Sequence, residues 1–159
     1  MIELKTAVLV GAALKMGAII SGASKSDLKL IYSFGVDLGI AFQLQDDYLD
    51  AFGNQSLVGK SIGGDIIENK KTAMFHLSLS NSDKLQKEEL IKLYNNYNQT
   101  DKISKVKKIF KDTGSDSKTL DLVKEYTNRA LLSIKKLSIS NEKKLELIKF
   151  SKSLMDRKL

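Results

Sequence analysis

Hydrophobic residues recur along most of this chain at intervals of three and four, which is the spacing of one-sided helices. Such blocks predict helices at roughly 83–97, 101–113, 118–137 and 142–157, and a further helix that begins near Thr72. The clearest block, 118–137, has one apolar face made of Leu120, Val123, Tyr126, Ala130, Ile134 and Leu137. We find no convincing strand alternation and no internal repeat. The predicted fold class is therefore all-α.

The first third of the chain predicts two longer helices and a loop. A helix from about residue 3 to 20 is followed by Gly22, which suits a left-handed turn. Ser24 and Asp27 form a start signal for a second helix, which runs to Gly53. Residues 54–64 contain three glycines and few large apolar side chains, so they predict a loop. The methionines Met16, Met74 and Met155 are expected to fill gaps in the core.

The composition is that of an ordinary globular protein. The 159 residues are 42% apolar and 28% charged, which predicts one domain over residues 1–159. No cysteine is present, so the chain has neither a disulfide nor a thiolate metal site, and a cytoplasmic location is expected. The longest apolar stretch, residues 7–20, falls short of the roughly 20 residues that a membrane span needs. We therefore expect no membrane span.

The formal charge of +7 is unevenly distributed. Residues 1–80 have a net charge of −1 and residues 81–159 a net charge of +8. A basic half is one feature of nucleic-acid-binding modules. Here, however, lysines alternate with acidic residues along predicted helices, as in Glu88, Glu89 and Lys92, which is typical of a solvated helix surface. We expect no nucleic-acid partner.

Asp46, Asp47 and Asp50 give the first indication of chemistry. At spacings of three and four on a helix, their carboxylates project along one side, and Gln43 extends this polar stripe by one turn. Like charges at this spacing repel one another, and a divalent cation removes the repulsion. Mg²⁺ prefers oxygen ligands and commonly bridges carboxylates to phosphates. Taken alone, the three aspartates could equally be a solvated helix face.

The residues that follow favour a phosphate site. Lys60, the sequence Gly63-Gly64-Asp65 and Lys70 come next in the chain. Glycines let the backbone approach an anion closely, and lysines serve as mobile positive charges for phosphate oxygens. Carboxylates for a metal and ammonium groups for phosphate together predict a metal–diphosphate site.

These residues also carry a family resemblance. The segment Phe42-Gln43 with Asp46-Asp47-Tyr48-Leu49-Asp50, then Lys60, Gly63-Gly64-Asp65 and Lys70, resembles the second aspartate-rich region of the trans-prenyl diphosphate synthases. Upstream, Lys5-Thr6 resembles the Lys-Thr helix of that family. The resemblance implies a helical bundle of the isoprenoid-synthase fold, a homodimer, and two substrates, an allylic prenyl diphosphate and isopentenyl diphosphate.

The resemblance also implies a role for each matching residue. Asp46, Asp47 and Asp50 are expected to hold Mg²⁺, directly or through its water shell. Asp46, Asp47 and Lys5 are expected to act in catalysis. Contacts to diphosphate, or support of them, are expected from Lys5, Thr6, Gln43, Lys60 and Lys70.

The chain departs from the family pattern in one large respect. It contains no second Asp-Asp pair, and its only arginines are Arg129 and Arg157, so it is similar to the C-terminal half of a synthase. We therefore expect little synthase activity from these residues alone. The alternatives are a non-catalytic diphosphate-binding subunit or regulator of the same fold and a fragment of a terpene cyclase.

Overall fold

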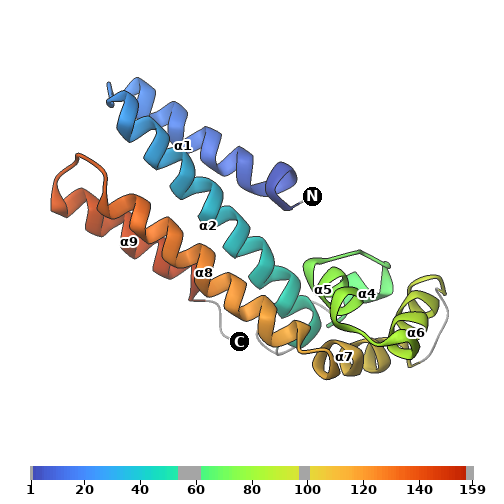
Figure 1. The fold of residues 1–159 in the computed structure, drawn as a ribbon. Coiled ribbons are helices and arrows are strands. Elements are labelled where there is room, and N and C mark those ends of the chain that lie inside the picture. The colour runs from blue at the N-terminus through green and yellow to red at the C-terminus, as the bar shows by residue number, and fades with distance from the viewer. Residues whose placement is uncertain (1, 54–61, 97–100, 157–159) are drawn as a thin grey trace. The chain divides into compact units, whose positions relative to one another are not determined.

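The computed structural model describes residues 2–53, 62–96 and 101–156 (Figure 1). These residues form helices joined by short turns, and no strand occurs among them, which confirms the all-α prediction. In chain order the helices are the π-helix η1 (Glu3–Ala7), α1 (Val8–Ile20), α2 (Lys25–Phe52), α4 (Gly64–Ile67), α5 (Ala73–Asn81), α6 (Lys84–Tyr94), α7 (Lys102–Asp112), α8 (Ser115–Lys135) and α9 (Asn141–Met155).

The chain divides into two compact units. Unit 1 comprises Met1–Leu44 and Leu122–Arg157, and unit 2 comprises Gln45–Asp121. The boundaries fall inside α2 and inside α8, so each of these helices contributes to both units. That residues 1–159 form one domain stays a prediction.

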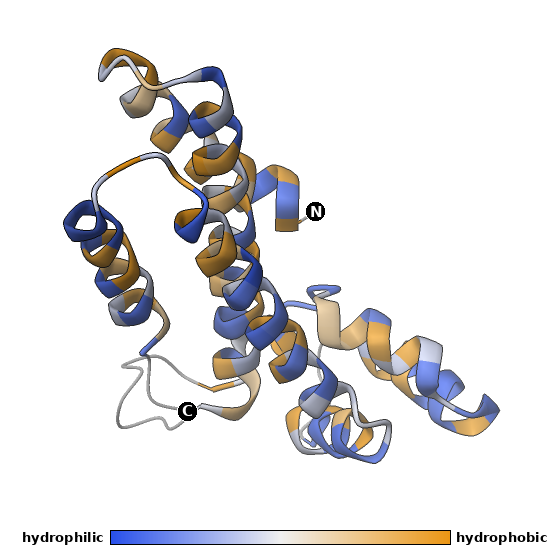
Figure 2. Ribbon diagram, turned by 60° about the vertical axis from the view of Figure 1, so that its left-hand side comes forward, coloured by the Kyte–Doolittle hydropathy of each residue, from blue (hydrophilic) through white to orange (hydrophobic). Residues whose placement is uncertain are grey.

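Unit 1 has a core shared by α1, α2, α8 and α9. Its buried centre includes Phe34 and Leu38 of α2 and Ala130 and Ile134 of α8, all fully buried. Side chains of α1 and α9 pack around this centre. The helices have apolar and polar faces, as the mixed colouring along them shows (Figure 2). Of the predicted apolar face, Val123, Ala130 and Ile134 of α8 and Leu137 just after it are buried, and Leu120 and Tyr126 are half-buried.

Glycines bring the first helical segment, η1 and α1, into close contact with α2. A Cβ placed on Gly35 would lie 2.7 Å from the Cα of Gly11, and one placed on Gly39 would lie 2.7 Å from the Cα of Ala7. Real side chains do not approach backbone atoms this closely. The two helices can therefore pack backbone to backbone only while these positions lack a side chain.

The junction between α1 and α2 forms as the sequence predicts. Gly22 has a φ of 72°, so it provides the left-handed turn that ends α1. The Ser24 hydroxyl accepts the backbone N–H of Asp27 at 3.1 Å and donates to the Asp27 carboxylate at 2.9 Å. The same carboxylate accepts the backbone N–H of Ser138 at 2.8 Å. Together these hydrogen bonds lower the pKa of Asp27.

Unit 2 has its own core beneath α5, α6 and α7. Among the described residues, this core is formed by Ala51, Ile66, Met74, Phe75, Leu90, Leu93, Tyr94, Val106, Ile109 and Phe110, all buried. The first turn of α6 is closed by a capping box between Asp83 and Gln86. The helix start near Thr72 is confirmed, with Thr72 as the residue that precedes α5.

The structure corrects three details of the sequence analysis. Gly64, predicted as loop, begins the short helix α4. The first helix opens as a π-helix before it becomes α-helical at Val8. Met16 was predicted to lie in the core, but it is 58% exposed, because α1 is apolar on more than one face and only one of them packs on α2. Residues 54–61 of the predicted loop lie outside the described residues.

Within the described part of the chain, none of the helices is both long enough and apolar enough to cross a bilayer.

Candidate functional site

Unit 1 holds three of the predicted site residues, Lys5, Thr6 and Gln43. Thr6 lies in η1, and its hydroxyl donates a hydrogen bond of 3.1 Å to the Gln43 side-chain oxygen on α2. Gly39, one turn before Gln43, permits the close approach of Ala7 that brings the two segments together. Lys5 is exposed next to Thr6. The structure therefore joins Thr6 to Gln43, with the Lys5 side chain open to solvent beside them.

Unit 2 holds the three aspartates on the last turns of α2. Asp46 and Asp50 are four residues apart, on the same side of the helix, and both are partly exposed, whereas Asp47 is only 7% exposed. Among the His, Cys, Asp and Glu residues that the structure describes, no three are arranged to hold a metal ion by themselves. The aspartates thus supply oxygen ligands on one helix without forming a closed cage.

Asp50 is connected to the start of α4. Its carboxylate accepts the backbone N–H of Asp65 at 2.9 Å, and its backbone carbonyl accepts the N–H of Gly63 at 2.7 Å. A Cβ on Gly64 would lie 3.3 Å from the other carboxylate oxygen of Asp50. The two glycines before Asp65 therefore keep the backbone of α4 against this carboxylate.

The electrostatics around Asp50 are those of crowded carboxylates. Burial raises the pKa of Asp50, and the charges of Asp65 and Asp46 raise it further. The N–H of Asp65 and the ammonium of Lys70 act in the opposite direction without cancelling the rise. A positive charge added near Asp50 would therefore stabilise its ionised form.

Lys70 lies beside this cluster. Its ammonium is 2.6 Å from the Asp65 carboxylate and 3.0 Å from that of Glu68, and both contacts raise the pKa of Lys70. The structure therefore brings Asp50, Asp65 and Lys70 together. Lys60, the remaining predicted phosphate ligand, lies outside the described residues.

Two residues of this region have no role assigned by the sequence analysis. In the sequence Asp65 stands out only as part of Gly63-Gly64-Asp65, yet its N–H donates to Asp50 and its carboxylate pairs with Lys70. Lys102 is 3% exposed and donates to the side chain of Asn69. A sequence signal for Lys102 existed, because it lies four residues before Val106 on the buried face of α7.

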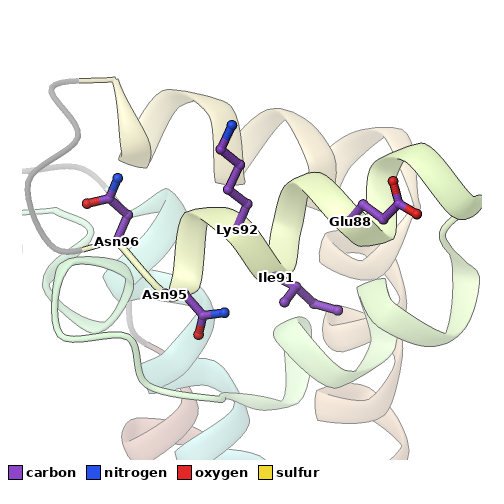
Figure 3. Close-up of a pocket in the computed structure, with 5 residues that line it drawn as sticks. All are labelled: Glu88, Ile91, Lys92, Asn95 and Asn96. Atoms are coloured by element: carbon purple, nitrogen blue, oxygen red, sulfur yellow. The ribbon is translucent and has the colours of Figure 1, made fainter.

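A separate pocket of about 540 Å³ lies along α6 and the residues just after it (Figure 3). In this view Lys92 and Ile91 point away from the helix in different directions. Its lining consists of Glu88, Ile91, Lys92, Asn95 and Asn96. None of these is a predicted site residue, so the pocket is not part of the aspartate cluster.

Comparison with known proteins identifies the family. The sequence model of the family described as polyprenyl synthetase matches residues 1–113, which include every predicted site residue. The chain belongs to the polyprenyl synthetase family. This confirms the resemblance that rests on the aspartate-rich segment and the Lys-Thr pair.

Relatives and solved structures agree with this assignment. Over 151 residues the chain is 30% identical to a geranylgeranyl diphosphate synthase of Saccharolobus solfataricus, covering 94% of this chain and 45% of that protein. A crystal structure of a geranylgeranyl pyrophosphate synthase superposes with a TM-score of 0.86 at 44% identity, covering 99% of this chain and 50% of the other. A Corynebacterium glutamicum synthase, solved with isoprenyl diphosphate and magnesium, superposes at 0.87 with 26% identity, covering 98% and 45%. The chain thus spans about half the length of these proteins.

Proposed function

We propose that this chain supplies the allylic-diphosphate-binding part of a prenyl diphosphate synthase. The observation that carries the proposal is the contact of Asp50 with Asp65 and, through it, Lys70, because carboxylate oxygens, the ligands that Mg²⁺ prefers, lie beside an ammonium group. Membership in the polyprenyl synthetase family supports the same conclusion. The reaction is the transfer of a prenyl group from an allylic diphosphate to isopentenyl diphosphate.

In unit 2, Asp46, Asp47 and Asp50 are the residues proposed to hold Mg²⁺. The donor set fits this ion, since carboxylate oxygens are its preferred protein ligands. Burial, and then the neighbouring charges of Asp65 and Asp46, raise the pKa of Asp50, so a bound cation would stabilise its ionised form. Mg²⁺ usually keeps several waters and binds through few carboxylates plus substrate phosphates, so the proposed site does not require a cage of three protein ligands. When bound, the ion would stabilise negative charge on the leaving diphosphate.

The positive and polar side chains have a complementary role. In unit 1, the exposed ammonium of Lys5 is proposed to bind a diphosphate oxygen, with Thr6 fixing the side chain of Gln43 for a second polar contact. In unit 2, Lys70 is proposed to exchange part of its pairing with Asp65 and Glu68 for diphosphate. Lys60 is assigned to the same task from the sequence alone.

Binding of diphosphate is expected to depend on Mg²⁺. Inorganic pyrophosphate titrated into the chain should bind about tenfold more tightly with Mg²⁺ than without it, a difference of about 1.4 kcal/mol. In Asp46→Ala this difference should disappear, because an oxygen ligand of the ion is lost. Isothermal titration calorimetry measures both affinities.

The matched control is Asp112→Ala, which removes an exposed carboxylate at the end of α7. It should bind like the unchanged protein. Equal affinity of the unchanged protein with and without Mg²⁺ would contradict the proposed function.

A polypeptide of these 159 residues is expected to show little synthase turnover. It contains only one Asp-Asp pair, whereas the resemblance implies a second aspartate-rich cluster in the complete site. A steady-state assay with an allylic diphosphate, isopentenyl diphosphate and Mg²⁺ measures this. Robust turnover by the purified polypeptide would overturn the expectation, while Mg²⁺-dependent binding without turnover agrees with it and also with a non-catalytic subunit.

A cytoplasmic location and a homodimer complete the proposal. The absence of cysteine supports the first, and the family resemblance supports the second.

A further inference from the structure

Lys102 is an unusual residue to find buried. It is the first residue of α7 and is 3% exposed. The N-terminal end of a helix carries partial positive charge, so a lysine there is opposed by the helix dipole as well as by burial. Burial indeed lowers the pKa of Lys102. Such a placement is stable only if the ammonium group gains compensating contacts.

Those contacts lie at the C-terminal end of α4. The Lys102 ammonium donates to the side-chain oxygen of Asn69 and lies 3.5 Å from the backbone carbonyl of Ile67. It also lies 5.7 Å from the centre of the Tyr94 ring, within the range of a cation–π interaction. Lys102 therefore places a positive charge at the C-terminal end of α4, where the helix dipole favours it.

Asn69 is the residue that ends α4. It has a φ of 57°, the left-handed conformation. Its N–H donates to the carbonyl of Ile66 at 3.2 Å, and the N–H of Lys70 donates to the carbonyl of Asp65 at 2.9 Å. These two bonds are the pair that defines a Schellman motif. This ending directs the chain so that Lys70 returns to Asp65, the residue that it pairs with at 2.6 Å.

The next residue of α7 contacts the opposite end of α4. A Cβ on Gly63, the residue before α4, would lie 2.9 Å from the Ile103 side chain. Lys102 and Ile103 thus hold the two ends of a helix of only four residues. A helix this short has little stability of its own, so its conformation depends on such contacts.

We propose that Lys102 is a positioning residue, whose contact with Asn69 fixes α4 so that Asp65 and Lys70 are held at Asp50. The inference rests on the proposed function for its effect on ligand binding, but its structural part is independent of any ligand. Lys102 is not among the predicted substrate-binding residues, and its contacts with Asn69 and Ile67 connect it to α4.

The experiment compares Lys102→Met with Lys105→Met, an exposed lysine on the same helix. Methionine keeps the length of the side chain without burying a charge. Amide hydrogen exchange, followed by NMR, reports on α4 directly. In Lys102→Met the amides of Asp65, Asn69 and Lys70 should exchange about tenfold faster, while those of α5 change less than about twofold. Lys105→Met should leave both sets unchanged.

A second variant, Asn69→Gly, removes the same contact from the side of α4 and replaces Lys102→Met should that variant not fold. Glycine accepts the left-handed conformation but removes the oxygen that Lys102 contacts. It should accelerate exchange at Asp65 and Lys70 in the same way. Unchanged exchange at these amides in both variants overturns the proposal, as does an equal acceleration in α4 and α5, which would indicate a general loss of stability.

The affinity for inorganic pyrophosphate in the presence of Mg²⁺ tests the effect of Lys102 on ligand binding. Affinity should fall about five- to tenfold in Lys102→Met and Asn69→Gly and stay unchanged in Lys105→Met. If the unchanged protein shows no Mg²⁺-dependent binding, the proposed function fails, and hydrogen exchange alone decides the role of Lys102. If it binds and both α4 variants bind equally well, the role of Lys102 in positioning the site is refuted.

Discussion

Gly35→Ala is expected to lower the free energy of unfolding by about 2–3 kcal/mol, although alanine is the better helix former. The new Cβ would lie 2.7 Å from the Cα and 2.9 Å from the N of Gly11, and 2.9 Å from a methyl group of Leu14. Backbone atoms of a packed helix cannot move aside as the end of a long side chain can. The two helices must separate, which loses contacts along their whole interface.

Gly17→Ala is the matched control for this prediction. Gly17 also lies in α1, yet no heavy atom comes within 4 Å of a Cβ built there. The same substitution should therefore stabilise the protein by about 0.5–1 kcal/mol through helix propensity alone. Urea denaturation followed by circular dichroism gives both values. Equal effects of the two substitutions would show that the close approach of α1 and α2 does not limit stability.

Helix positions could be predicted because they depend on local chemistry. Gly22 and Gly114 follow the ends of helices and have positive φ angles of 72° and 65°. Because glycine adopts such angles readily, its position in the sequence already predicts these helix ends. By contrast, α4 escaped prediction because four residues cannot display a helical period. Its conformation depends on Asp50 and Lys102, which are distant in sequence.

The candidate site was likewise predictable only where it depends on residues that are close in the sequence. Spacing alone places Asp46 and Asp50 on one side of α2, and both are partly exposed there. Spacing does not show that Asp47 is buried, since that depends on what packs against the end of α2. Nor does it show that Asp65 donates its N–H to Asp50 across 15 residues. Met16 illustrates the same limit, because the sequence of an apolar helix does not indicate which face is covered.

In unit 1, an ion pair joins Asp37 to Arg129, a residue distant from it in the sequence. Asp37 is 7% exposed on α2, and the Arg129 guanidinium lies 3.0 Å from its carboxylate. Arg129 also stacks on the Tyr126 ring at 4.8 Å from its centre. Burial raises the pKa of Asp37, and the charge of Arg129 lowers it only in part. The carboxylate therefore remains costly to ionise in the folded protein.

Arg129→Met is expected to destabilise the protein by about 2 kcal/mol at pH 7, because it leaves the Asp37 carboxylate buried without its counter-charge. The cost is smaller than the 3–5 kcal/mol typical of fully buried pairs, since half of the Arg129 side chain is solvent-exposed. Loss of the arginine raises the pKa of Asp37 further above its unfolded value of about 3.9. The destabilisation should therefore be full above the raised pKa and shrink as the pH falls toward 4, where the folded protein takes up the proton. Urea denaturation of variant and unchanged protein at each pH measures the difference.

The control is the same substitution in an Asp37→Asn background, which has no carboxylate to bury. There Arg129→Met should lower the free energy of unfolding much less and show no such pH dependence. A cost that is the same at pH 4 and pH 7 would mean that Arg129 acts through its packing on Tyr126 and not through its charge.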